Sequence, residues 1–411
     1  MNSSLSLESL RACHLADMLE RMLQKTASDL HLKSGSPPGF RVGLGIETEG
    51  TEAPLSAEDI EKIVEAIVPE RLRTRLIDAD AEIETAFSVE GVSRYRASIF
   101  RQRGMFSIVL RRIPVEVPDF FRLGLPDVAR KLALLNRGLV LVTGPTGSGK
   151  STTLAALIDY LNQETSMHII TLEEPIEFIH ADKKCFITQR EIGEDSASFH
   201  QALRRALRQD PDVLMIGEMR DVDTISLALG AAETGHLVFA TLHTTGAVQT
   251  VDRVLDAFPA ESRSRARIQL AATLQGVISQ LILPKVRGGR TAAFEVLIAS
   301  DAVRNLIRED KTHQIASLLQ TGSSAGMQTM ESSLAEMVRN NVITAQTALD
   351  NSSNPETLQQ FLSAAPQRNQ ARTGPDLRRT PVPQPATTPA PREPIPEVRS
   401  TEEILEKLRR S

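Results

Sequence analysis

The sequence predicts an α/β protein with two folded domains and a disordered tail, and three observations support this. A phosphate-binding pattern, Gly-x-x-x-x-Gly-Lys-Ser, occupies residues 144–151 directly after an apolar strand. From residue 127 onward, short apolar strands alternate with helical segments, which is typical of a parallel sheet covered by helices on both faces. Beyond Ala365 the chain is rich in Pro, Thr, Arg and Gln and cannot bury enough apolar surface to fold.

Composition narrows the class of protein. The 411 residues allow two or three domains, and 41% hydrophobic residues allow each a sizeable core. A net charge of −5 and the absence of Trp disfavour a nucleic-acid translocase, so we expect no nucleic-acid partner. The cysteines, Cys13 and Cys185, form neither a metal motif nor a disulfide framework. With no signal-peptide pattern and no apolar run of about 20 residues, we expect a cytoplasmic protein.

The sequence pattern of residues 1–113 predicts a small α+β domain. An apolar stripe through residues 6–26 predicts a helix, and a strand, a Gly/Pro turn and a second strand follow. Ser56 begins another helix, with Asp59 at the capping-box position where Glu or Gln is commoner. Alternating apolar and polar residues then predict a β-meander, and prolines mark residues 114–126 as a linker.

Residues 127–362 predict the larger domain. Its four buried-strand candidates read GLVLVTG, HIITLEE, VLMIGE and HLVFATLH, and residues 259–350 are expected to be mainly helical. The tail, 363–411, ends in a short amphipathic helix with a capping box. Ile404, Leu405 and Leu408 of that helix could dock a regulator, or the helix could be a frayed end without a role, because such short helices are marginal alone.

The phosphate-binding loop predicts a nucleotide site. Glycines let backbone N–H groups approach phosphates, and the following helix adds the positive end of its dipole. Lys150 is expected to contact the β- and γ-phosphates, and the hydroxyl of Ser151 to bind Mg²⁺. The expected nucleotide-binding residues of this segment are Gly144, Pro145, Thr146, Gly147, Ser148, Gly149, Lys150, Ser151 and Thr152.

Two acidic segments follow buried strands. Glu218 is the first acid after the apolar run VLMI and could order Mg²⁺-bound water or activate the attacking water. The alternative is a strand-end charge paired with Arg220. Glu173 lies in TLEEPIEFIH, and because parallel strands end at one edge of a sheet, Glu173 and Glu218 are expected to converge on one phosphate. The alternative for Glu173 is a solvated loop.

Two histidines bracket the strand in ETGHLVFATLH. His243, at the carboxyl end of the strand, could sense a γ-phosphate. His236, seven positions earlier, could instead be a structural hydrogen-bonding residue.

These elements, in this order, resemble the secretion-ATPase superfamily, the motors of type II secretion and type IV pili. The segment AVRNLIRED is similar to the AIRNLIRE signature of the PilT retraction ATPases, and ASDLHL and GMQTM match the same family. Assembly and secretion motors often carry a tetracysteine zinc motif, which this chain lacks. The corresponding family motifs are the Walker A motif Gly144–Ser151, the Asp box Thr171–His180, the Walker B motif Val213–Asp221 and the His box Thr234–Thr244.

The resemblance implies a PAS-like N-terminal domain, a RecA-like ATPase domain, a ring of six subunits, and an ATP- and Mg²⁺-dependent motor for pilus retraction and twitching motility. The implied partner is a platform protein of the inner membrane, at whose cytoplasmic face the ring would lie. By the same resemblance, the catalytic residues are Glu218, Glu173, Lys150, His243, Arg96 and Arg111, further nucleotide-binding residues are His236, Arg204 and Arg208, and Ser151 and Glu218 are the metal ligands.

Alternatives remain at this point. A C-terminal extension also occurs in the accessory paralogue PilU, so a PilU-like regulatory subunit with negligible turnover, or a PilU-like partner, stays open. A type II secretion or pilus assembly ATPase is the other alternative. Arg304, Leu306 and Arg308 of AVRNLIRED could couple hydrolysis to retraction, or the segment could be a capped helix packed on its neighbour.

Overall fold

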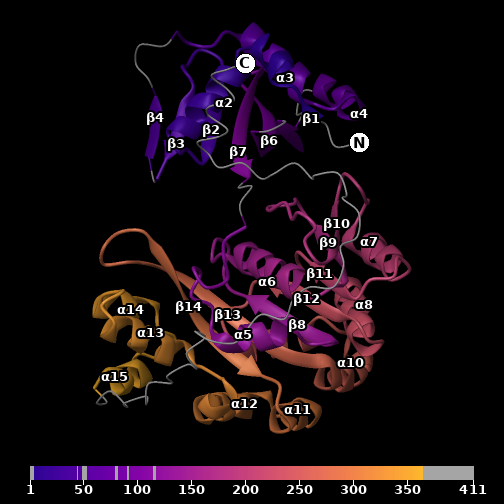
Figure 1. The fold of residues 1–411 in the computed structure, drawn as a ribbon, viewed down its shortest axis with the longest axis vertical. Coiled ribbons are helices and arrows are strands. Elements are labelled where there is room, and N and C mark those ends of the chain that lie inside the picture. Colours follow the sequence, from indigo (N-terminus) through magenta and orange to yellow (C-terminus); the bar gives the residue numbers. More distant parts are fainter. Residues whose placement is uncertain are drawn as a thin grey trace, which may run out of the picture. The chain divides into compact units, whose positions relative to one another are not determined.

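The computed structural model describes residues 4–43, 45–48, 53–78, 82–89, 92–113 and 117–363. The chain divides into two compact units, which meet in the sequence between Glu116 and Val117 (Figure 1). The domain limits at 113, 126 and 362 stay predictions, since a compact unit need not be an independently folding domain. The predicted tail, with its terminal helix, lies outside the described residues from 364 onward.

The first unit is one seven-stranded sheet with helices packed on one face. The strand order is β1-β5-β6-β7-β2-β3-β4; β1 pairs parallel with β5, and all the other neighbours pair antiparallel. Its elements are β1 (Ser4–Leu5), α1 (Leu7–Arg11), α2 (Leu15–Gln24), β2 (Asp29–Lys33), β3 (Gly39–Val42), β4 (Gly45–Thr48), α3 (Ala57–Ile67), α4 (Glu70–Arg73), β5 (Glu82–Val89), β6 (Ser93–Gln102) and β7 (Met105–Ile113).

Helix starts in this unit follow local chemistry. The helix predicted over 6–26 is two helices, because His14 takes a left-handed conformation (φ 58°) and α2 begins after it. At α3 the capping box is complete with Asp59: Ser56 N donates to its carboxylate at 2.8 Å, and Asp59 N donates to Ser56 Oγ at 3.1 Å. Asp therefore serves where Glu or Gln is commoner.

The second unit contains a seven-stranded sheet in the order β10-β9-β11-β12-β8-β13-β14. All neighbours are parallel except β13 and β14, which form a hairpin. The strands are β8 (Gly138–Thr143), β9 (His168–Glu173), β10 (Phe186–Glu191), β11 (Val213–Ile216), β12 (Leu237–Leu242), β13 (Leu274–Pro284) and β14 (Arg290–Ile298).

The expectation that residues 259–350 are mainly helical is wrong for 274–298, which form β13 and β14. Gly288 and Gly289, both at positive φ, turn the chain between the two strands. Gly276 fits the close packing of β13, since a Cβ would lie 2.8 Å from Leu132 Cδ1 and 3.0 Å from the carbonyl oxygen of Leu297. Leu274, Val277, Ile278, Leu281 and Ile282 of β13 recur at the spacing of an amphipathic helix, so periodicity alone predicts a helix here.

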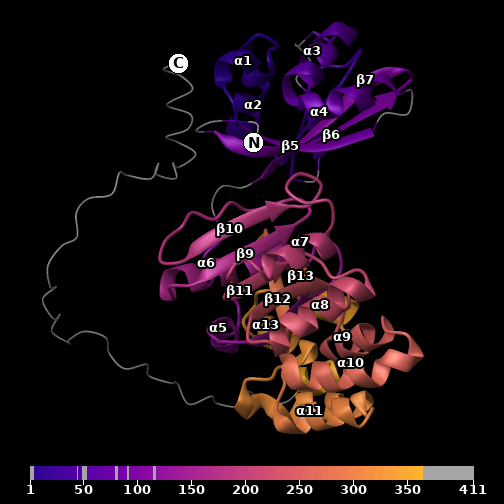
Figure 2. The same cartoon turned by 90° about the vertical axis from the view of Figure 1, so that its right-hand side faces the viewer.

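Helices cover both faces of this sheet, as a parallel sheet requires. In Figure 2, α5 and α6 lie on one side of the strands, and α7 to α10 lie on the other. The helices are α5 (Asp127–Ala133), α6 (Lys150–Glu164), α7 (Phe199–Ala206), α8 (Val222–Glu233), α9 (Ala247–Asp256), α10 (Ala260–Thr273), α11 (Asp301–Arg308), α12 (Ile315–Thr321), α13 (Met330–Arg339), α14 (Ala345–Asn351) and α15 (Pro355–Ser363).

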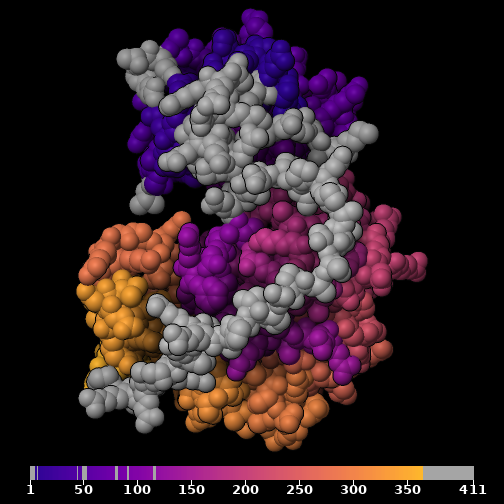
Figure 3. All heavy atoms as spheres, in the orientation of Figure 1, coloured from indigo at the N-terminus to yellow at the C-terminus, as the bar shows by residue number. Residues whose placement is uncertain are grey.

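The last three helices form a smaller core on the hairpin. Leu283 of β13 and Ala293 of β14 are buried with Leu334 of α13 and Leu358 of α15. In Figure 3 the yellow atoms of this lobe lie directly against the orange atoms of the hairpin. None of the helices in the described part of the chain combines the length and apolarity needed to cross a bilayer.

Candidate functional site

The loop between β8 and α6 has a backbone that only glycines allow. Gly147 and Gly149 have φ of +78° and +85°, in the left-handed region. At Gly144 (φ +146°) a Cβ would collide with the carbonyl oxygen of Gln280 and with Ser148 Oγ. The loop delivers the chain directly into α6, whose first-turn N–H groups have no intrahelical acceptor. This arrangement is suited to bind an anion.

Lys150 and Ser148 supply polar groups to the loop. Lys150 is 9% exposed, and its Nζ donates to the carbonyls of Gly144 (2.9 Å) and Pro145 (3.0 Å). Ser148 Oγ is buried and has no hydrogen-bond partner within the described residues. A buried ammonium over a glycine loop, beside an unused hydroxyl, fits the phosphates of a nucleotide. Thr146 and Gly147 are exposed, and Ser151 and Thr152 lie half-buried in the first turn of α6.

Glu218 follows β11 and has both carboxylate oxygens engaged. His243 Nε2 lies 2.9 Å from one oxygen, and Arg220 Nη2 lies 2.8 Å from the other. Burial raises the pKa of Glu218, but the hydrogen bond from Arg220 and the charge of His243 outweigh burial and lower the pKa below its ordinary value of 4.5. Glu218 is therefore ionised at neutral pH. The ion pair with Arg220 is present, and it is part of the cluster rather than an alternative to it.

His243 connects Glu218 to the phosphate-binding loop. Its Nδ1 lies 3.4 Å from Lys150 Nζ while its Nε2 bonds to the carboxylate. The imidazole is 44% exposed at the carboxyl end of β12. A half-exposed imidazole between an ammonium and a carboxylate can respond to a phosphate that binds Lys150.

The two acids of the Asp box have different partners. Arg220 Nη1 donates to Glu174 at 3.1 Å, so Glu174 joins the cluster of Glu218 through this arginine. Glu173 is buried and accepts hydrogen bonds from Thr171 Oγ1 (2.6 Å) and Gln189 Nε2 (3.1 Å). The structure thus links Glu174 rather than Glu173 to Glu218 through a shared arginine. The sequence offered two adjacent acids and no signal to choose between them.

The structure does not bring His236 to the loop within one chain. His236 precedes β12, at the opposite end of that strand from His243. Its Nδ1 lies 3.0 Å from the carbonyl of Ala231 and 3.3 Å from Thr234 Oγ1, at the end of α8. The structural interpretation of His236 matches this placement.

Arg204 and Arg208 have exposed side chains on α7 and just beyond its end. The helix runs back from the edge that carries Glu218 toward the start of β11, so Arg208 lies toward the other end of the sheet. Contacts of these arginines with nucleotide remain a prediction.

Arg96 and Arg111 belong to the first unit, on β6 and β7, where they are directly opposite in register. Arg96 Nε donates to Glu84 at 2.9 Å, and Arg111 Nε donates to Asp29 at 2.7 Å. Their predicted role at the nucleotide remains a prediction.

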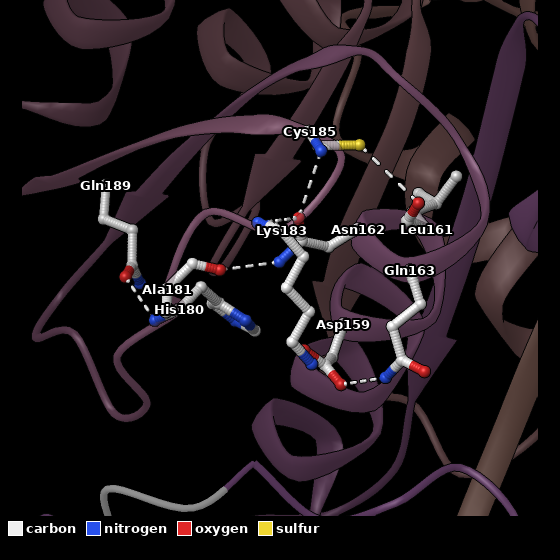
Figure 4. A network of polar contacts seen from close by, with 9 residues as sticks. All are labelled: Asp159, Leu161, Asn162, Gln163, His180, Ala181, Lys183, Cys185 and Gln189. Carbon is white, nitrogen blue, oxygen red and sulfur yellow. Dashed lines mark hydrogen bonds and ion pairs between the residues drawn. The ribbon is translucent and has the colours of Figure 1, made fainter. Parts of the chain in front are cut away.

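Asn162 is a buried residue whose role the sequence did not reveal. Figure 4 shows its side chain holding the segment after the Asp box: it donates to Ala181 O at 2.7 Å and accepts from Lys183 N (2.9 Å) and Cys185 N (3.2 Å). Asn162 lies in the last turns of α6, the helix that starts at Lys150. The amide therefore ties the end of that helix to the segment after the Asp box.

The segment AVRNLIRED forms α11, and its side chains divide into inward and outward groups. Arg304 donates to the carbonyls of Ala271 and Ala272, both at 2.9 Å, and to Gln275 Oε1 at 3.0 Å. It therefore closes the carboxyl end of α10 rather than facing solvent. Arg308 is exposed, and Leu306 is half-buried.

Comparisons with known proteins agree with this arrangement. The family model described as "Type II/IV secretion system protein" matches residues 80–288. The type IV pilus retraction ATPase PilT of Pseudomonas aeruginosa is 47% identical over 344 residues, which cover 83% of this chain and 99% of that protein. The type IV pilus ATPase PilU of the same organism is 40% identical over 333 residues, covering 81% and 87%. A crystal structure of the pilus retraction motor PilT with bound ADP matches with a TM-score of 0.79 and 46% identity, covering 84% of this chain and 98% of that chain.

Proposed function

Because the chain belongs to the type II/IV secretion family and, within it, to the PilT-type pilus retraction ATPases, we propose that it forms a hexameric ring that converts ATP hydrolysis into pilus retraction. The single observation that carries this proposal is the cluster of Lys150, His243 and Glu218 at the phosphate-binding loop. A motor needs a group that binds the γ-phosphate, a group that senses it and a group that orients water, and this cluster offers all three.

Lys150 would bind the β- and γ-phosphates, and the N–H groups of the loop would bind the remaining phosphate oxygens. Glu218, ionised by its cationic neighbours, would orient or deprotonate the attacking water. Ser151 and Glu218 would hold Mg²⁺, which supplies charge neutralisation between the phosphates when bound. Arg96 and Arg111 would bind the phosphoryl group as its charge develops, and Glu173 would keep the Asp box in place.

His243 would report the γ-phosphate. Its Nδ1 contacts Lys150 and its Nε2 contacts Glu218, so a phosphate that engages Lys150 would take the ammonium from Nδ1 and change the hydrogen bonding of the imidazole that holds Glu218. Repeated around a ring, such changes would move a PAS-like domain of residues 1–113 against a RecA-like domain of 127–362. The ring would act at the cytoplasmic face of the inner membrane on a platform protein.

The retraction assignment over the accessory one is supported by the higher identity with PilT than with PilU. The test is live imaging of labelled pili in cells that lack the gene and carry either the wild-type chain or Glu218→Gln. We expect retraction with the wild-type chain only. Retraction that is unchanged by the variant would point to an accessory subunit and to another motor.

A second experiment tests the ring. Light scattering of the purified chain with ATP and Mg²⁺ should give six subunits per particle. A stable monomer under these conditions would contradict the proposal.

A further inference from the structure

The first unit presents two arginines side by side on its sheet. Arg96 of β6 and Arg111 of β7 are direct cross-strand neighbours, so both side chains lie on one face. Their side chains are 42% and 66% exposed. Two exposed guanidinium groups in adjacent positions form a natural clamp for a phosphate.

The other arginines of the same two strands are buried or half-buried, and two of them bond elsewhere. Arg94 is 5% exposed and donates to Ser88 Oγ at 3.5 Å. Arg101 donates to three main-chain carbonyls and stacks over the ring of Phe106. The Nε of Arg112 is buried. Arg96 and Arg111 differ from these arginines because their ion pairs use Nε and their side chains are exposed.

Each arginine of the pair is anchored by a carboxylate through its Nε. The anchor of Arg111 is Asp29, whose side chain is 4% exposed and whose second oxygen accepts from Ser28 Oγ at 2.7 Å. The anchor of Arg96 is Glu84, whose side chain is 49% exposed. Water screens the ion pair of Arg96 with Glu84 but hardly reaches the buried carboxylate of Asp29. Asp29 therefore holds Arg111 in a more defined orientation.

We propose that Asp29, in the ASDLHL segment, is a positioning residue that orients the Arg111 guanidinium for the hydrolysis reaction. This inference rests on the proposed function, in which Arg111 meets the phosphoryl group. An Nε anchor leaves both terminal nitrogens of the guanidinium as donors for phosphate oxygens. Burial raises the pKa of Asp29, but hydrogen bonds from Ser28 and Arg111 outweigh it and lower that pKa, so the anchor stays charged.

A positioning role acts on the transition state. A misoriented guanidinium still attracts ATP, but it fails to follow the charge that develops on the transferred group. Loss of the anchor therefore lowers kcat and leaves the KM for ATP nearly unchanged. A purely structural role would instead lower the amount of folded protein.

The test measures kcat and KM of the full chain with Asp29→Asn and with its matched variant Glu84→Gln. We expect Asp29→Asn to lower kcat about tenfold, with KM within about twofold, because neutral Asn cannot replace the charged bond. Glu84→Gln should lower kcat by no more than about threefold, because water already screens that pair. Thermal unfolding of each variant checks the fold.

The double variant separates positioning from structure. In an Arg111→Gln background, Asp29→Asn should cause no further fall in kcat, because the residue acts through the arginine. A further tenfold fall, a rise in KM instead of a fall in kcat, or an unchanged kcat in Asp29→Asn would overturn the positioning role. If Arg111→Gln alone leaves kcat unchanged, the arginine role in the proposed function fails, whatever Asp29 does.

Ser28→Ala covers the case in which Asp29→Asn does not fold. It removes the hydroxyl bond to the second carboxylate oxygen and a longer hydroxyl bond, 3.5 Å, to the carbonyl of Arg41, and it leaves the Asp29 carboxylate in place. We expect a smaller fall in kcat, about two- to threefold, that again disappears in the Arg111→Gln background. A fall that persists in that background would contradict the proposal.

Discussion

The phosphate-loop edge of the second unit and the arginine face of the first unit are built differently. At the edge, side chains from three strand ends bond to one another, from Lys150 through His243 to Glu218. On the arginine face, Arg96 and Arg111 each bond to a separate carboxylate. The members of the first cluster hold one another in place, whereas each arginine is held by its own carboxylate and not by the other arginine. The difference separates a cluster of polar side chains that is already assembled from two arginines that are each held singly.

The largest effect is expected at the phosphate-loop edge of the second unit. Lys150→Ala removes the buried ammonium that contacts the loop, and ATP hydrolysis should fall about 10²–10³-fold, with much weaker nucleotide binding. Steady-state hydrolysis and binding of a fluorescent nucleotide measure both. Lys131→Ala, an exposed lysine on α5, is the control and should leave hydrolysis intact. Equal activity of the two variants would contradict a role of the phosphate-binding loop in hydrolysis.

The two histidines sharpen the comparison within one strand. His243→Ala should lower kcat on the order of tenfold to a hundredfold, because it breaks the only imidazole bridge described between Lys150 and Glu218. His236→Ala should cost about 1 kcal/mol in the free energy of unfolding and leave kcat nearly unchanged, since its bonds are to the end of α8. A comparable fall in kcat for both would mean that His236 serves a nucleotide, for example one bound to a neighbouring subunit.

Much of the phosphate-loop edge of the second unit can be predicted from the sequence, because its residues follow strands with clear apolar runs. Parallel strands end at one edge, so Lys150, Glu218 and His243 were predictable as neighbours. Which Asp-box acid joins them was not, because Glu173 and Glu174 are adjacent and only the backbone decides their directions. The hairpin of β13 and β14 was missed because the apolar residues of β13 recur at helical spacing, and pairing with β8 and β14 overrides that pattern.

The arrangement of the arginine face of the first unit could not be predicted from the sequence in the same detail. Its alternating pattern predicts a meander, but the pairing of Arg96 with Arg111 depends on register, which the turn residues alone do not reveal. Asp29 is 82 positions from Arg111 in the chain, so no local pattern links them. The family resemblance pointed to Arg96 and Arg111, and the structure adds the carboxylates that bind them, Glu84 and Asp29.

A third prediction concerns Asn162, whose buried side chain holds the segment after the Asp box. Asn162→Ala leaves two N–H groups and one carbonyl without their partner, which should lower the free energy of unfolding by about 2–4 kcal/mol. Gln163→Ala, next in the chain, loses one exposed bond to Asp159 and should change it by less than about 0.5 kcal/mol. Thermal unfolding compares them. Equal, small changes in the unfolding of both variants would show that the segment after the Asp box keeps its conformation without the side chain of Asn162.

The smallest effect is a pH dependence at His180. Burial lowers the pKa of His180 from 6.5 to about 4. Above pH 6.5 the residue is neutral in both states and has no effect. As the pH falls from 6.5 toward 4, only the unfolded chain takes up the proton, so stability decreases, by about 1.4 kcal/mol at pH 5.5.

His180→Gln should flatten this part of the stability profile, while His313→Gln, at an exposed position, should leave it unchanged. Urea unfolding at pH 7.0 and 5.5 measures the difference. An identical acid slope in wild type and His180→Gln would show that the imidazole is already accessible to protons in the folded state.

Hydrolysis by Glu218→Gln is the most direct test of the whole account, in which the chain is an ATPase and Glu218 orients the attacking water. Wild type and variant are compared at saturating ATP and Mg²⁺, with nucleotide binding measured in parallel. The account predicts turnover by the wild-type chain, a loss of at least about a hundredfold in the variant, and ATP binding within a few-fold in both. Equal turnover in both proteins, or negligible turnover in both with intact binding, would contradict it.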